Sequence, residues 1–302
     1  DSRIVIYGSI QEIRDTINFR NRLVDELLLL NDPKVYEQLM DALLFKDAEK
    51  QVFKETGFII EGATRYREIA YISGLLKALP KGSLKSFRSV LIARIVAPSE
   101  IREGEKIDGF YINGESFIVT IPFGYSRVTG YTNTGTVNHE IGHYIRATLC
   151  TDFEKEEWQA LHRASSGEQS FVNENAKTDF SEDHAETYEL WTRDTQALVD
   201  KASQSKDATL QKKILELVLS PRNAEPFLRF ENGKAYLSIF KANHRQEIEL
   251  PFKDESEITN DPIGTFKILY NKVSSYEFEG YEFDLIRMLE IPITAKIEDA
   301  VS

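Results

Sequence analysis

The residues best suited to chemistry in this sequence form a His-Glu-x-x-His group at positions 139–143. The apolar residues around this group recur at Val137, Ile141, Tyr144 and Ile145. This spacing predicts a helix. On a helix His139 and His143 lie about 40° apart and one turn from each other. Both imidazoles can therefore bind one zinc ion.

Glu140 directly follows the first histidine and points just off the face that the two imidazoles share. From there its carboxylate can reach a water molecule in the open coordination position of the metal. Zinc lowers the pKa of such a water, and a nearby carboxylate can accept the proton. We therefore expect Glu140 to be the general base. The chain has only 5 histidines among 302 residues, so two of them at this spacing are not a common coincidence.

A third protein ligand is needed, because catalytic zinc usually has three and leaves the fourth position to water. The best source is the segment 171–188, whose second half has helical spacing. Asp179 or Ser181 can cap this helix. Glu182 and Glu186 stand one turn apart on one side of it. From the residues alone, either glutamate can be the ligand.

The two segments together resemble bacterial zinc metallopeptidases of the anthrax lethal factor and Pro-Pro endopeptidase type. The likeness rests on the His-Glu-x-x-His helix and on Phe-Val-x-x-x-Ala-Lys-Thr-x-x-x-Glu-Asp-x-Ala-Glu-Thr at 171–187, and it covers about residues 85–200. The resemblance implies a zincin-like α+β fold, a zinc ion, a peptide or protein substrate and a secreted protein. It also implies that Glu182 is the third ligand, and that Glu186 belongs to the outer shell.

The sequence departs from this family seven residues before Glu182. The family usually has a tyrosine there, whose hydroxyl is thought to stabilise the oxyanion, and this chain has Asn175. An amide can also donate a hydrogen bond to an oxyanion, so we expect Asn175 to take this role. Tyr125, Tyr131 and Tyr188 are nearby alternatives, although packing is the commoner role for such residues.

The elements before the motif helix change from helical to strand-like sequence. Residues 1–80 show helical apolar spacing and are expected to form an N-terminal helical region. Residues 81–200, the expected zincin catalytic domain, begin with strands. Two of these flank Asn113-Gly114, which predicts a two-residue hairpin. The strand at 116–121 can border the substrate and pair with an extended peptide, or it can be an internal strand.

The remaining residues, 201–302, carry no motif that assigns them a chemical role. A polar, linker-like run at 201–207 precedes a helix at 209–219. Three short strands follow, the first two joined through Asn232-Gly233. We expect a C-terminal accessory module or an extension packed on the protease.

Composition narrows the classes of partner. The net charge is −12 and no basic cluster stands out, which argues against nucleic acid as a partner. No run of about 18 apolar residues is present, so no membrane span is expected. The single cysteine, Cys150, cannot form an internal disulfide and is expected in the core. The chain starts at Asp1 and not at Met, which together with the resemblance predicts a processed, secreted protein.

The sequence therefore predicts a zinc-dependent endopeptidase that acts on an extended peptide. The alternative is a zincin-fold peptide- or protein-binding module with weak or no catalysis, motivated by Asn175 at the tyrosine position. A structural protein with a structural zinc is a further alternative. The intact Glu140 favours catalysis over both, because a structural site needs no base.

Overall fold

A computed structural model describes residues 134–205, 207–220, 225–241 and 244–278, together with short strands between 59 and 120. It also describes Asp15, Asn18, Leu76, Ala78 and Leu79. The helices are α4 (Thr134–Thr148), α5 (Asp152–Ala164), α6 (Phe180–Arg193), α7 (Thr195–Gln204), α8 (Thr209–Leu219), α9 (Glu255–Asn260) and α10 (Pro262–Ser274). The 3-10 turns η2 (Glu168–Ser170) and η3 (Asn175–Lys177) lie between α5 and α6.

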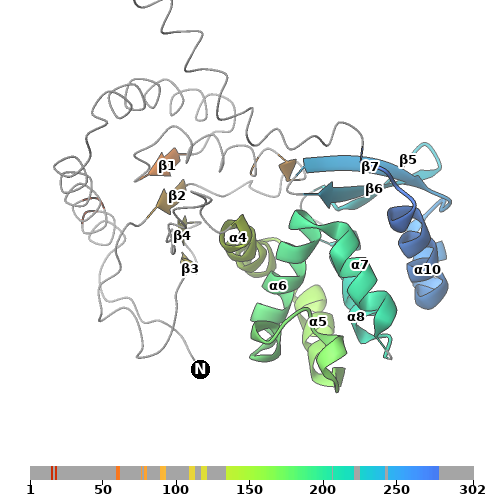
Figure 1. The fold of residues 1–302 in the computed structure, drawn as a ribbon, viewed down its shortest axis with the longest axis horizontal. Coiled ribbons are helices and arrows are strands. Elements are labelled where there is room, and N and C mark those ends of the chain that lie inside the picture. Colours follow the sequence, from red (N-terminus) through yellow and green to blue (C-terminus); the bar gives the residue numbers. More distant parts are fainter. Residues whose placement is uncertain are drawn as a thin grey trace, which may run out of the picture.

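The strands form two sheets on different sides of the helices. They are β1 (Ile59–Glu61), β2 (Ser89–Ile92), β3 (Gly109–Ile112), β4 (Phe117–Thr120), β5 (Leu228–Glu231), β6 (Lys234–Lys241) and β7 (His244–Leu250). Helix α4 lies between the four-stranded sheet and α6, and it contacts β3, β4 and α6 (Figure 1). The second sheet lies beside α6 and α7, and α10 contacts β7.

The four-stranded sheet has the order β1-β2-β4-β3. Strands β1, β2 and β4 are parallel, and β3 pairs antiparallel with β4 from Ile112↔Phe117 to Gly109↔Thr120. The predicted hairpin strands are confirmed, but pairing starts at Phe117, and the turn itself lies outside the described residues. Strand β4 has a partner on both sides. It is therefore internal, as one of the two interpretations had it, and it offers no free edge to a peptide.

The three-stranded sheet is an antiparallel meander, β5-β6-β7. Asn232 and Gly233 join its first two strands with φ of 53° and 72°. A turn with positive φ at both central residues suits the right-handed twist of a hairpin, and Asn-Gly adopts it at little cost. The hairpin predicted from Asn232-Gly233 is confirmed.

Local capping explains where the helices around the site begin. Thr151 and Glu154 form a capping box at the start of α5, with the Glu154 amide 3.3 Å from Thr151 Oγ1. Asp179 caps α6, accepting hydrogen bonds from the Ser181 and Glu182 amides at 2.6 and 3.0 Å. The predicted linker at 201–207 is wrong in its first half, because α7 continues to Gln204.

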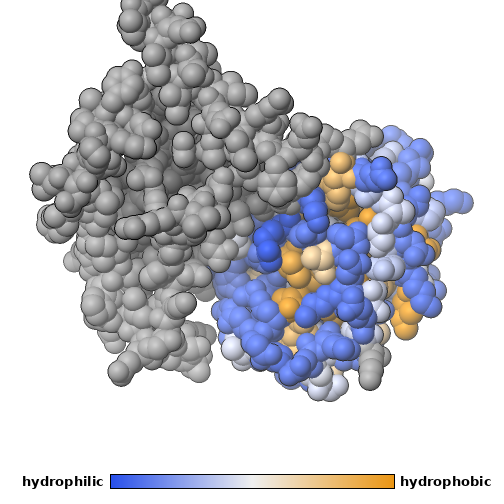
Figure 2. Space-filling model, in the orientation of Figure 1, coloured by the Kyte–Doolittle hydropathy of each residue, from blue (hydrophilic) through white to orange (hydrophobic). Residues whose placement is uncertain are grey.

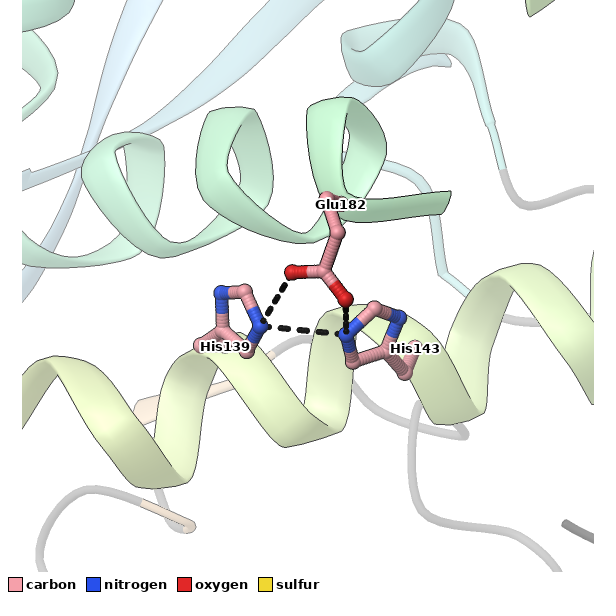
Figure 3. A group of neighbouring side chains, drawn as sticks. All are labelled: His139, His143 and Glu182. Carbon is pink, nitrogen blue, oxygen red and sulfur yellow. Dashed lines mark hydrogen bonds and ion pairs between the residues drawn. The ribbon is translucent and has the colours of Figure 1, made fainter. Parts of the chain in front are cut away.

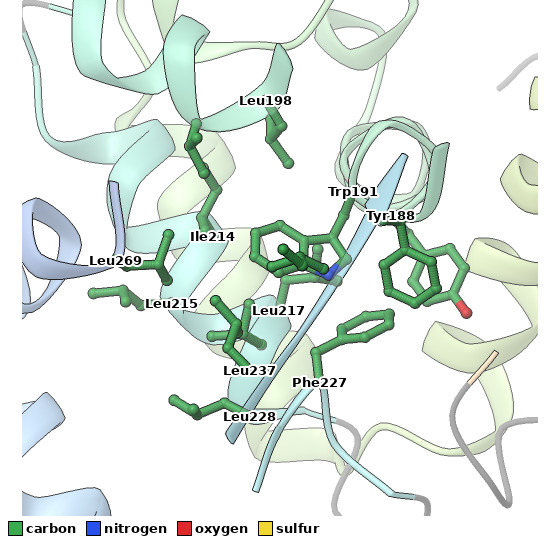
Figure 4. Close-up of a cluster of buried hydrophobic side chains, with 14 of the residues drawn as sticks. Tyr188, Trp191, Leu198, Ile214, Leu215, Leu217, Phe227, Leu228, Leu237 and Leu269 are labelled. Atoms are coloured by element: carbon green, nitrogen blue, oxygen red, sulfur yellow. The ribbon is translucent and has the colours of Figure 1, made fainter. Parts of the chain in front are cut away.

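Buried apolar side chains from both sides of residue 200 form one core. Trp191 and Tyr188 of α6 pack near Phe227, with ring centroids 5.9 and 5.6 Å from the Phe227 ring (Figure 4). Leucines and isoleucines of α7, α8, α10 and β6 complete this cluster, and Cys150 is buried as expected. The division into domains at residues 80 and 200 stays a prediction, but the described part of the core is continuous across residue 200.

The described chain is an α+β protein, as predicted. The zincin-like topology stays a prediction, and the expected N-terminal helical region lies almost entirely outside the described residues. The face shown in Figure 2 is mostly hydrophilic over the described residues, with smaller hydrophobic areas. No helix in the described part of the chain has the length and apolar character that a membrane crossing requires.

Candidate metal centre

Three side chains from two helices meet at one point (Figure 3). His139 and His143 come from α4, and their Nε2 atoms lie 3.0 Å apart. Glu182 comes from the first turn of α6. Its Oε2 lies 3.2 Å from His139 Nε2, and its Oε1 lies 3.3 Å from His143 Nε2. These residues form the one group in the described chain that is arranged to hold a metal ion.

The distances fit one metal ion bound by all three residues. A tetrahedral zinc ion with bonds of about 2.0–2.1 Å holds its ligand atoms about 3.3 Å apart. The two Nε2 atoms, 3.0 Å apart, are close to that edge length, and each lies 3.2–3.3 Å from a different oxygen of the Glu182 carboxylate. One ligand atom from each residue lies within 4.8 Å of the other two. Two imidazoles and one carboxylate are also a common ligand set of catalytic zinc, which keeps its fourth position open.

The other imidazole nitrogens have partners that orient the rings. His139 Nδ1 lies 3.3 Å from Glu186 Oε1, and His143 Nδ1 lies 3.0 Å from Ser181 Oγ. An imidazole that donates through Nδ1 to an oxygen presents the lone pair of Nε2 to a metal, and such partners also raise its basicity. The structure thus places Glu182 at the two Nε2 atoms and Glu186 behind His139.

Asn175 lies at the centre, but its amide contacts carboxylates. Its Nδ2 lies 2.8 Å from Glu182 Oε2 and 2.8 Å from Glu186 Oε1, so both of its N–H bonds are used. Asn173 Nδ2 also donates to Glu186, at 2.6 Å. In this arrangement Asn175 ties the two glutamates together. It has no further N–H to offer an oxyanion unless one of these hydrogen bonds breaks.

The carboxylates and imidazoles of this group stabilise each other's charged forms. Burial disfavours the Glu182 carboxylate, but hydrogen bonds from His139 and His143 outweigh burial and lower its pKa. Burial also opposes the protonated form of His139, yet hydrogen bonds to Glu182 and Glu186 raise its pKa well above the ordinary value. The carboxylates thus favour a positive charge at the imidazoles, and a bound cation can supply it.

Glu140 lies next to the candidate ligand His139, as expected of a general base. It follows His139 on α4, its side chain is buried, and its charge raises the pKa of His139. Its role in proton transfer stays a prediction. Among the alternatives to Asn175, Tyr188 is buried in the core beside Phe227, and burial raises the pKa of its hydroxyl. Tyr125 and Tyr131 lie outside the described residues.

The close crossing of α4 and α6 was not anticipated from the sequence. A Cβ at Gly142 would lie 2.8 Å from Ala185 Cα and 3.2 Å from Tyr188 Cβ. Only glycine fits there without a shift of the backbone. Gly142 lies between the two histidines, and Ala185 follows Glu182 by three residues. The small residues at these two positions were the signal in the sequence from which a close crossing could have been predicted. They let α4 and α6, which carry the candidate ligands, approach each other closely.

Comparison with known proteins assigns no relatives. No family model matches the chain, and no match is found among curated proteins or among solved structures.

Proposed function

We propose that the protein is a zinc-dependent endopeptidase. The observation that carries the proposal is the meeting of His139, His143 and Glu182 at separations suited to one zinc ion. The resemblance of the two motif segments to zinc metallopeptidases of the anthrax lethal factor type supports the same reading. Zinc would supply Lewis acidity, which makes water acidic in the open position and polarises a carbonyl.

The protein's own residues account for the remaining steps. His139, His143 and Glu182 hold the metal, and Glu186 and Ser181 orient the imidazoles. The Glu140 carboxylate takes a proton from the attacking water and passes it to the nitrogen of the leaving amine. Asn175 and Asn173 keep the glutamates in place. The group that donates to the oxyanion is not assigned among the described residues.

Two histidines and one carboxylate also hold Fe(II) in non-haem oxygenases. Glu140 favours hydrolysis over that chemistry. A carboxylate directly after the first ligand on the same helix is needed to accept a proton from water, and oxygenase chemistry does not require it.

A peptide substrate fits the edge of the four-stranded sheet better than its centre. Strand β4 is paired on both sides, whereas β3 lies at one edge of the sheet that the described strands form, and it contacts α4. An extended peptide can add to such an edge strand through main-chain hydrogen bonds. We therefore place the peptide along β3.

The test compares the parent with Glu140→Gln under zinc-replete conditions. Glutamine keeps the size of the side chain and removes the base. We expect Glu140→Gln to bind zinc and peptide like the parent and to hydrolyse a peptide library at least about 10²-fold more slowly. A parent that binds zinc but cleaves nothing in a broad library, with Glu140→Gln identical to it in binding, would defeat the protease proposal.

The second candidate is a peptide- or protein-binding module on the same fold with weak or no catalysis. The specific observation in its favour is Asn175, because its two N–H bonds go to Glu182 and Glu186. A site that lacks an oxyanion donor binds a peptide without strongly stabilising the transition state. Retained peptide binding without turnover would support this candidate.

A further inference from the structure

A buried ion pair lies beside the candidate metal centre but supplies none of its three ligating residues. Asp183 directly follows Glu182 on α6, about 100° around the helix. Its Oδ2 lies 2.7 Å from Lys213 Nζ of α8, and both side chains are 0% exposed. His162 Nδ1, from α5, lies 3.1 Å from the same oxygen. One carboxylate oxygen thus links α6 to α5 and to α8, and both of these helices also pack against α6.

Lys213 also reaches the segment that carries the asparagines. Its Nζ lies 3.0 Å from the carbonyl oxygen of Ser170 and 4.2 Å from the centroid of the Phe171 ring. Ser170 Oγ in turn donates to Asp207, which also accepts a hydrogen bond from the Thr209 amide at 2.9 Å, just before α8. The single ammonium therefore binds α6, which supplies Glu182, and the segment just before Asn173 and Asn175, whose amides contact Glu182 and Glu186.

Stability alone does not explain a charged pair at this place. Burying an aspartate and a lysine costs desolvation that their attraction only about offsets, and uncharged replacements of similar shape are often neutral or stabilising. The pair can instead restrict the orientation of α6 and of the segment before Asn173. An ammonium held at 2.7 and 3.0 Å by two oxygens favours one rotation of α6 and one position of Ser170, because hydrogen bonds depend on direction and the hydrophobic effect does not.

We propose that Asp183 and Lys213 are a positioning pair for the metal centre. The pair sets the rotation of α6 and the path of residues 170–175, and it thereby holds Glu182, Asn173 and Asn175 around the metal. This inference rests on the proposed metal site. It also gives the C-terminal part of the chain a task, because α8 supplies the lysine.

The experiment measures zinc affinity and unfolding separately in the full-length chain. The main variant is Asp183→Asn/Lys213→Met, which removes both charges and nearly keeps both shapes. Zinc affinity is measured by competition with a chelating dye, and the unfolding of the metal-free protein is followed in urea. We expect the variant to fold cooperatively and to bind zinc about 10- to 100-fold more weakly, the usual effect of losing an outer-shell support.

Two further variants make the result specific. Asp183→Asn alone keeps an oxygen for Lys213 and His162, and we expect a smaller loss of zinc affinity. The control is Arg229→Gln/Glu247→Gln, which removes an ion pair of 2.9 Å between β5 and β7. This pair lies on the three-stranded sheet and contacts none of the candidate ligands, so we expect zinc affinity within about twofold of the parent.

Each other outcome has a distinct meaning. A folded double variant with the zinc affinity of the parent would overturn the positioning role and leave the proposed function intact. A double variant that does not fold would show that the pair holds the fold itself, and this would also overturn the inference. A parent that binds no zinc would overturn the proposed function and the positioning role together.

Discussion

Two neighbouring acidic residues on α6 have opposite surroundings. Glu182 is 27% exposed, contacts two imidazoles and an asparagine amide, and has a lowered pKa despite burial. Asp183, the next residue, is fully buried, and burial raises its pKa although Lys213 and His162 oppose the shift. The first carboxylate is exposed enough to meet a ligand from solvent, and the second is closed to it.

Helix α6 thus presents neighbouring acidic residues to two different surroundings, the candidate site and the core. On the side of Glu182 and Glu186 the carboxylates contact groups that can change partners when a metal binds. On the side of Asp183 the partners are fixed by packing. Substitutions on the first side should therefore act on metal binding, and a single substitution on the second side, which leaves a buried charge without its partner, should act first on folding.

The largest effect is expected at the ligand itself. Glu182→Ala removes one of the three proposed protein ligands, so we expect the purified variant not to retain stoichiometric zinc. Glu186→Ala removes a partner of His139, Asn173 and Asn175 but no proposed ligand, and it should weaken zinc binding about 10- to 100-fold. Elemental analysis after dialysis measures both. Full occupancy in Glu182→Ala together with loss in Glu186→Ala would reverse the choice of ligand.

The single variant Lys213→Met tests the other side of α6. It leaves the Asp183 carboxylate buried without its cation, which costs about 3–5 kcal/mol of unfolding free energy. Urea unfolding of the metal-free protein measures this loss, and Glu182→Gln serves as the control with a smaller loss, because Glu182 is 27% exposed and its change leaves no fully buried charge unpaired. If Lys213→Met were as stable as Glu182→Gln, the contrast between the two sides would be wrong.

Gly142→Ala tests the helix crossing that brings the two sides of the site together. The added Cβ meets backbone at 2.8 Å, which cannot give way as a flexible side chain would. We expect a loss of about 1–3 kcal/mol in the unfolding free energy of the metal-free protein. Gly167→Ala is the control, because a Cβ there meets nothing closer than 4.0 Å. Equal stability of the two variants would argue against a tight crossing.

The smallest effect is expected at Asn175, and the useful result is whether the substitution changes zinc affinity or turnover. If Asn175 only ties Glu182 to Glu186, then Asn175→Ala should weaken zinc binding about tenfold and leave turnover of the zinc-saturated protein nearly unchanged. If it donates to the oxyanion, turnover should fall roughly 10²-fold with little change in substrate binding. Zinc titration together with kcat and KM at saturating zinc separates the two roles.

Features set by neighbours in the sequence were predictable from it. The i, i+4 spacing places His139 and His143 on one face of a helix wherever that helix packs. The Thr151 capping box, the Asp179 cap and the Asn232-Gly233 turn each depend on hydrogen bonds or dihedral angles within a few residues. Such interactions involve only residues close together in the sequence, so they can be predicted without knowledge of the tertiary contacts.

Features that depend on distant segments were decided only by the tertiary structure. Residue spacing did not decide which of Glu182 and Glu186 is the candidate ligand. In the structure the Glu182 carboxylate lies at the two Nε2 atoms and the Glu186 carboxylate lies at Nδ1 of His139. This difference follows from how α6 crosses α4 at Gly142 and Ala185. The internal place of β4 and the contact of Lys213 with Asp183 depend likewise on pairings across many residues. The sequence alone determined which side chains were available for a metal and for a base. Packing determined which of them meet, because the rotation and approach of two helices are set by the whole surface that they bury together.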